Sequence, residues 1–78
     1  LRLEKLELSP DSKLVGKKLN ESYIKRDTNG AMILAIEKQD QKIVVNPAGD
    51  TMLEPKDVFL SIGNDDQIKA LKKLVSNK

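Results

Sequence analysis

The sequence contains no cysteine, no histidine and no tryptophan, and its 78 residues include only two aromatic side chains, Tyr23 and Phe59. Without cysteine there can be no disulfide framework and no thiolate metal site, and without histidine the usual metal ligand and general base at neutral pH are missing. The serines have no histidine to activate them, and no nucleophile elbow or phosphate-binding loop occurs. Two aromatics are too few for the stacking platform of single-stranded nucleic-acid binders. We therefore predict a protein that is not an enzyme.

Long hydrophobic runs are also missing, since the longest uninterrupted apolar stretch covers only residues 31–36. A membrane-spanning helix needs about 20 such residues, and a signal peptide needs a basic start followed by a longer apolar stretch. We therefore expect no direct membrane insertion and a cytoplasmic location. Because the chain begins with Leu1 rather than Met and opens directly into alternating sequence, we expect a piece of a longer protein.

Charge is balanced rather than concentrated. Fourteen basic and twelve acidic residues leave a net charge of +2, and the two signs are interspersed along the chain. No field of one sign would hold a polyanion, so we do not expect nucleic acid as a partner. The length fits a single domain over residues 1–78, and a domain of this size buries only about 60% of its extended-chain surface. We therefore expect a homodimer.

Four short stretches have the patterns of β-strands, namely residues 5–8, 31–36, 42–46 and 58–62. The alternation in the first stretch slips between Leu3 and Leu6, which indicates a bulge or a late strand start. The second stretch is apolar without alternation, as in a central strand covered on both faces. A short polar loop separates it from the third stretch, which predicts a hairpin. The pair Asn29-Gly30 before this hairpin predicts a chain reversal with positive φ.

Two stretches have helical signals. Residues 12–19 begin with Ser12, a suitable N-cap, and carry apolar residues on one side, so we predict a short helix there. Gly16 lies inside it at a cost of about 1 kcal/mol relative to Ala. The second helix begins after Asn64, which forms a capping-box pattern with Gln67. Its apolar positions recur at helical spacing, at Ile68, Leu71, Leu74 and Val75.

The resulting element order is strand, helix, three strands, helix (β-α-β-β-β-α). Because short turns join the three consecutive strands, they should pair mostly antiparallel, with the helices covering the sheet. The sequence therefore predicts a small two-layer α+β domain. Exposed apolar surface on the strands and the first helix is the expected contact between two copies.

Several local strings, taken in order, resemble the C-terminal lobe of regulator-of-potassium-conductance (RCK) proteins, also called the TrkA-C domain. The strings are SKLVGKKL at residues 12–19, Ile24 a few residues on, TNGAMILAI at 28–36, IVVNPAGDTMLEPKDVFLSIG at 43–63, and the closing helix. The resemblance extends from Leu6 to about Val75. Each string alone is mostly turn and core sequence, whereas their order and spacing together are fairly specific.

This resemblance implies a cytosolic regulatory domain of a potassium channel or potassium transporter. Family members typically pair through this lobe, and some bind a small ligand in the cleft between the copies, cyclic di-AMP being the known example. Binding there shifts the assembly between conformations and biases pore opening, which requires different affinities for the two states. The implied partners are a second copy, the membrane subunit of the same system and a small anionic nucleotide. The implied location is the inner face of the cell membrane, and no cofactor beyond the regulatory ligand is implied.

The same resemblance implies a set of ligand-binding residues. In members that bind cyclic di-AMP, a basic residue follows the aliphatic position that Ile24 matches, and here Lys25 and Arg26 supply positive charge for a phosphodiester. Pro47 matches a residue that lines the cleft. Met32 stands where those members have Asn, and the stretch after Ile24 is one residue longer than theirs. We expect Ile24 and Met32 to pack against a base.

Two alternative functions remain open. The first is a purely structural dimerisation domain of a transporter, in which Lys25 and Arg26 are ordinary surface charges of a solvated turn. The second is a nucleic-acid-binding accessory domain, which the mixed charge disfavours and which a steep salt dependence of polyanion binding would support. Three acidic residues, Asp50, Glu54 and Asp57, suggest a hard cation, but no EF-hand ligand sequence is present, so we predict no metal site.

Overall fold

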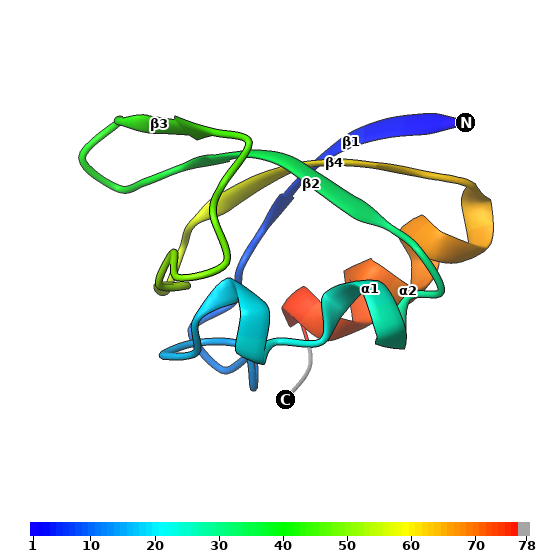
Figure 1. Ribbon diagram of the computed structural model, residues 1–78, viewed down its shortest axis with the longest axis horizontal. Coiled ribbons are helices and arrows are strands. Elements are labelled where there is room, and N and C mark those ends of the chain that lie inside the picture. The colour runs from blue at the N-terminus through cyan, green and yellow to red at the C-terminus, as the bar shows by residue number, and fades with distance from the viewer. Residues whose placement is uncertain (77–78) are drawn as a thin grey trace.

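The computed structural model, which describes residues 1–76, contains a four-stranded antiparallel sheet with helices packed against one face (Figure 1). The sheet order is β1-β4-β2-β3. The strands are β1 (Arg2–Glu7), β2 (Met32–Glu37), β3 (Ile43–Val45) and β4 (Val58–Gly63). The helices are the 3₁₀ helix η1 (Leu19–Glu21), α1 (Ile24–Asp27) and α2 (Asp65–Ser76). The predicted two-layer α+β fold is confirmed.

The edge strand β1 begins earlier than predicted and pairs with β4 in continuous register along its whole length. Leu3 is exposed and Leu6 is buried, because the two side chains lie on opposite faces of the strand. The expected bulge or late strand start is therefore wrong. The alternation of apolar residues breaks because Leu3 and Leu6 lie on opposite faces of one regular strand. The irregularity lies instead in β2, whose register with β4 shifts between Ile33 and Ala35.

Strands β2 and β3 form the predicted hairpin, with Ile36 opposite Val44. Gln41 in the connecting turn has a positive φ of 70°. As its apolar run predicts, β2 lies inside the sheet between β4 and β3. The expected cover on both faces is wrong for the single chain, because Met32 is 46% exposed and Ile36 is the one fully buried residue of the strand. The face turned away from the helices therefore stays partly open.

The predicted helix over residues 12–19 is wrong, and turns take its place. Its backbone forms single turns, with the amide of Val15 donating to Ser12 O and that of Lys17 to Leu14 O, and it also pairs with Leu53. The amide of Gly16 donates to Leu53 O at 2.8 Å, and the amide of Leu53 donates to Lys17 O at 2.8 Å. Gly16 has a φ of 86°, a left-handed conformation that a helix interior excludes and that glycine adopts without penalty.

Helix α2 is capped as predicted. The amide of Asn64 donates to Gln67 Oε1 and the amide of Gln67 donates to Asn64 Oδ1, both at 2.8 Å. The side-chain amide of Gln67 also donates to Asn29 O at 2.7 Å, so it joins α2 to the turn after α1. Asn29 and Gly30 both have the expected positive φ. The fully buried face of α2 consists of Ile68, Leu71 and Val75.

The one-turn helix α1 has no counterpart in the sequence-based prediction, which interprets this stretch as a polar turn. Ile24 anchors it in the core cluster that includes Phe59. The buried hydroxyl of Thr28 donates to Ile24 O at 2.6 Å and accepts a hydrogen bond from the amide of Ala31 at 3.0 Å. These bonds close the turn and lead the chain from α1 directly into β2. In Figure 1, α1 and α2 lie on the same side of the sheet.

Candidate functional site

A cavity of about 440 Å³ lies between η1, α1, the start of β2 and the loop after β3. Its lining residues are Leu19, Asn20, Tyr23, Ile24, Lys25, Arg26, Ala31, Met32, Ile33, Asn46 and Pro47. All five residues expected from the sequence to bind a ligand are therefore brought to one cavity. The volume lies within the range of about 300–1,000 Å³ that is usual for small-molecule sites.

Hydrogen bonds of the backbone hold the loop after β3 in place as one wall of the cavity. Asn46 has a positive φ of 50° and its amide donates to Leu34 O at 2.7 Å, so the chain turns sharply before Pro47. The amide of Asn20 donates to Gly49 O at 2.8 Å, which attaches the same loop to η1. The cavity is thus built from segments that are distant in sequence and rigidly joined.

The floor of the cavity is apolar. Ile24 is only 4% exposed and belongs to the core, so it offers a ligand a small part of its surface. Met32 is 46% exposed and is the more accessible of the two expected base contacts. Ile33 and Leu19 are half-buried and pack against the core. The floor therefore offers apolar surface to a ligand.

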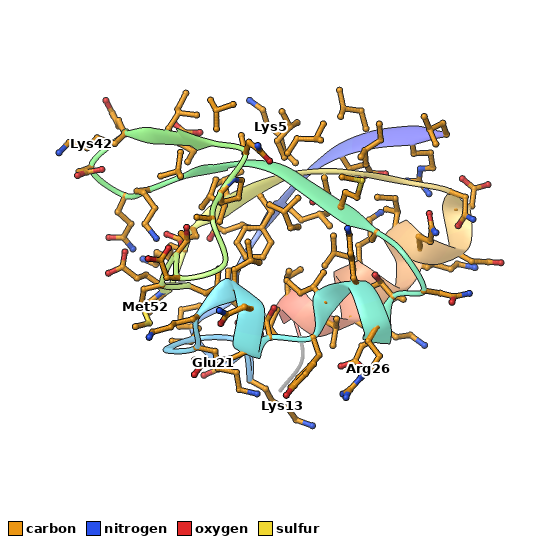
Figure 2. The ribbon with its side chains drawn as sticks, viewed as in Figure 1. Lys5, Lys13, Glu21, Arg26, Lys42 and Met52 are labelled. Carbon is orange, nitrogen blue, oxygen red and sulfur yellow. The ribbon has the colours of Figure 1, made fainter. Side chains whose placement is uncertain are left out.

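The rim of the cavity is cationic. Lys25 and Arg26 are both exposed, and Figure 2 shows Arg26 projecting from α1 away from the sheet. The guanidinium carbon of Arg26 lies 4.2 Å from the centroid of the Tyr23 ring, and its Nε donates to Asp27 Oδ1 at 3.0 Å. The lining contains no carboxylate or imidazole that could activate a nucleophile. The arrangement suits binding of an anion that carries an apolar ring.

Sequence reasoning missed several lining residues. Tyr23 is the most informative of them, because it is 55% exposed and contacts Arg26. The sequence contains a signal for Tyr23, because this aromatic residue directly precedes Ile24 and the two basic residues that we expect to bind the ligand. Asn46 was missed because its role depends on a turn, although the pair Asn46-Pro47 is typical of one.

The acidic residues considered as a calcium site hold a lysine instead. Lys38 Nζ lies 2.6 Å from Asp57 Oδ2 and 2.9 Å from Glu54 Oε1, whereas Asp50 is exposed to solvent. Burial by itself lowers the pKa of Lys38, but the hydrogen bonds and charges of Asp57 and Glu54 outweigh it and raise the pKa above its ordinary value. Within residues 1–76, no group of three or more acidic side chains is placed to hold a metal ion.

The described part of the chain has no helix that combines the length and the apolar character needed to cross a membrane.

The antiparallel sheet, its helical layer and the cation-rimmed cavity define a small α+β domain with one cavity of the size usual for small-molecule sites. A family model of the TrkA-C domain matches residues 3–76. The chain therefore belongs to the TrkA-C domain family, and the resemblance found in the sequence is confirmed.

The chain is 33% identical over 78 residues to Probable potassium channel protein 2 of Methanocaldococcus jannaschii, a match that covers 100% of this chain and 22% of the relative. The chain thus spans about a fifth of the length of that curated relative. Among solved structures it is similar to the RCK_C domain dimer of S. agalactiae BusR in complex with c-di-AMP. That match has 28% identity and a TM-score of 0.85, and it covers 96% of this chain and 90% of the other.

A longer S. agalactiae BusR structure, in complex with its busAB-promoter DNA, matches with 28% identity and a TM-score of 0.85. This match covers 96% of the present chain and 36% of the BusR chain. The chain is thus similar to part of a probable potassium channel protein and to part of a protein bound to DNA.

Proposed function

We propose that this chain is the ligand-sensing and dimerisation domain of a potassium channel or potassium transporter, and that it is not an enzyme. The observation that carries the proposal is the cavity, in which Lys25, Arg26, Met32, Ile24 and Pro47 meet. The relative in M. jannaschii supports a potassium channel as the host. In this proposal the domain lies at the cytoplasmic face of the membrane, because it is part of a channel or transporter in that membrane.

Cyclic di-AMP is the proposed regulatory ligand. Each half of this nucleotide carries one anionic phosphodiester and one adenine ring, which match a cationic rim and an apolar floor. Lys25 and Arg26 would donate charge-assisted hydrogen bonds to phosphate oxygens. Met32 and the edge of Ile24 would cover a base, with Pro47 on the opposite wall. The BusR lobe supports this assignment, since its structure is a dimer in complex with c-di-AMP.

The symmetry of the ligand supports a homodimer. Cyclic di-AMP has two equivalent halves, so two copies of one cavity facing each other would bind one nucleotide. A ligand that contacts both copies favours the assembly geometry in which the two cavities face each other. It would bias gating by its difference in affinity between that geometry and others. The channel or transporter subunit of the same system is then the partner that receives the signal.

The test is calorimetric titration of cyclic di-AMP into the purified domain at two salt concentrations, with mass measured by light scattering in the same buffer. We expect micromolar binding of one nucleotide per dimer. The variant Lys25→Ala with Arg26→Ala should lose this binding. Lys69→Ala with Lys73→Ala is the matched control, because it removes two exposed lysine charges from α2, outside the cavity.

Other outcomes of this titration decide against parts of the proposal. A dimer that releases no heat would favour a purely structural dimerisation domain. Equal loss of binding in both double variants would mean that general charge, rather than the cavity, attracts the nucleotide. Binding of promoter-length DNA with a steep salt dependence would instead favour a host of the BusR kind.

A further inference from the structure

Tyr23 has a backbone conformation that its side chain does not favour. Its φ of 55° and ψ of 31° lie in the left-handed region, which is unfavourable for a residue with a Cβ atom because that atom comes too close to the following carbonyl oxygen. Among residues 1–76 the other non-glycine residues with positive φ are Asn29, Gln41, Asn46 and Lys56, none of which is aromatic. A bulky aromatic residue at such a position is unusual, and strained residues of this kind cluster at ligand sites.

The ring of Tyr23 also contributes little to the core. Its side chain lines the cavity and is 55% exposed, and its residue precedes α1 without forming a side-chain cap. The unfavourable backbone conformation is therefore not explained by burial or by helix capping. At the cavity rim the ring contacts Arg26, whose guanidinium carbon lies over it, 4.2 Å from the ring centroid.

Two contacts restrict the Arg26 side chain. Its guanidinium carbon lies over the Tyr23 ring, 4.2 Å from the centroid, and Asp27 Oδ1 accepts a hydrogen bond from its Nε at 3.0 Å. These contacts leave the two terminal nitrogens, Nη1 and Nη2, for another acceptor. A guanidinium presented in this way can donate two parallel hydrogen bonds to one phosphodiester, which a flexible lysine cannot do.

We propose that Tyr23 is a positioning residue, which holds Arg26 flat against its ring so that the terminal nitrogens bind both free oxygens of one phosphodiester. This inference rests on the proposed function, because it concerns the same cavity and names how the anion is recognised. Tyr23 acts through Arg26. Its unfavourable left-handed backbone conformation is what orients the ring along the rim of the cavity. The contact raises affinity because Arg26 is already restricted to few rotamers before the ligand binds. Binding then loses less side-chain entropy.

The experiment is a double-mutant cycle on cyclic di-AMP affinity. Tyr23→Phe keeps the ring and should bind within about twofold of the wild type. Tyr23→Asn keeps a residue that tolerates the left-handed region, so it should be at least as resistant to urea, yet bind about fivefold more weakly. Arg26→Ala should weaken binding about tenfold or more. Adding Tyr23→Asn to Arg26→Ala should cause no further loss, because Tyr23 acts only through Arg26.

Arginine NMR provides a second readout that needs no ligand. In the wild type, the Arg26 Nε–H signal should show the ring-current shift of a stacked guanidinium, and this shift should disappear in Tyr23→Asn and persist in Tyr23→Phe. An unshifted Arg26 signal, or additive losses of affinity in the cycle, would overturn the positioning role while leaving the proposed function intact. Absence of cyclic di-AMP binding by a wild type whose Arg26 is stacked would overturn the proposed function and the phosphodiester part of this inference.

Discussion

At the scale of single residues, Lys38 shows how one side chain joins separate parts of the fold. Its ammonium group bonds Asp57 Oδ2 at 2.6 Å, Glu54 Oε1 at 2.9 Å and the carbonyl of Met52 at 3.0 Å. Asp57 is fully buried, and it also accepts a hydrogen bond from the amide of Glu54 at 2.9 Å. Lys38 therefore neutralises a buried carboxylate and ties the end of β2 to the loop before β4.

Replacing Lys38 by Met should lower the free energy of unfolding by about 3 kcal/mol, because a buried carboxylate then lacks its counter-ion. Urea unfolding followed by circular dichroism measures this loss. The comparison variant is Glu54→Ala, whose side chain is 58% exposed in the wild type and whose loss should cost less than about 1 kcal/mol. Equal losses in the two variants would show that Asp57 does not depend on Lys38.

The raised pKa of Lys38 predicts a specific alkaline dependence. Folding favours the charged lysine, so its contribution to stability is fully present below the ordinary lysine pKa of 10.5 and is lost as pH rises through the higher pKa of the folded state. The difference in unfolding free energy between the wild type and Lys38→Met should therefore stay constant at neutral pH and shrink above pH 10.5. A difference that does not change with pH would refute this linkage.

The proposed ligand-site residues show what sequence reasoning can find at this scale. Lys25 and Arg26 were identified because they follow Ile24 in a short stretch that resembles the family. Such a stretch can be recognised from the sequence without knowledge of the fold. Tyr23 lies next to them but was missed. Its proposed role in positioning Arg26 depends on a left-handed backbone and on the contact of its ring with the guanidinium. Conformation of this kind is set by tertiary structure rather than by residue type.

At the scale of elements, one predicted helix forms and the other does not. The difference lies in where their backbone groups find hydrogen-bond partners. Helix α2 carries its own start signal, because Asn64 and Gln67 cap each other across one turn. Residues 12–19 have helical spacing, but their backbone finds partners at Leu53, which is far along the chain. Helix α1 is too short for a periodic signal. The helix that carries its own cap was therefore predictable, whereas the structure of residues 12–19 was not, because backbone partners at Leu53 decide it.

Replacing Asn64 by Ala should test how much α2 depends on its cap. The change removes the acceptor for the amide of Gln67 and should cost about 1 kcal/mol. For a domain of this size the corresponding fall in Tm is about 4–8 °C, measured by thermal unfolding. Lys69→Ala, at an exposed position within α2, should leave Tm nearly unchanged. A fall in Tm of the same size for both variants would exclude a specific role for the cap.

At the scale of the whole molecule, the single chain leaves two surfaces open. The cavity between η1, α1, β2 and the loop after β3 is one of them, and the sheet face opposite the helices is the other. Figure 2 places Lys5 at the sheet and Arg26 beneath α1, on opposite sides of the molecule. A second recess, of about 90 Å³, lies on the sheet between Lys5 and Ile43. The proposed nucleotide site is the first of these surfaces.

The most direct measurement is nuclear magnetic resonance mapping of cyclic di-AMP on the ¹⁵N-labelled domain. We expect the largest changes in chemical shift at residues 23–26, 31–33 and 46–47, with an end point at one nucleotide per two chains. One set of signals should remain, as expected for a symmetric dimer. Changes confined to the recess between Lys5 and Ile43, or no changes at a nucleotide concentration well above micromolar, would contradict the central claim.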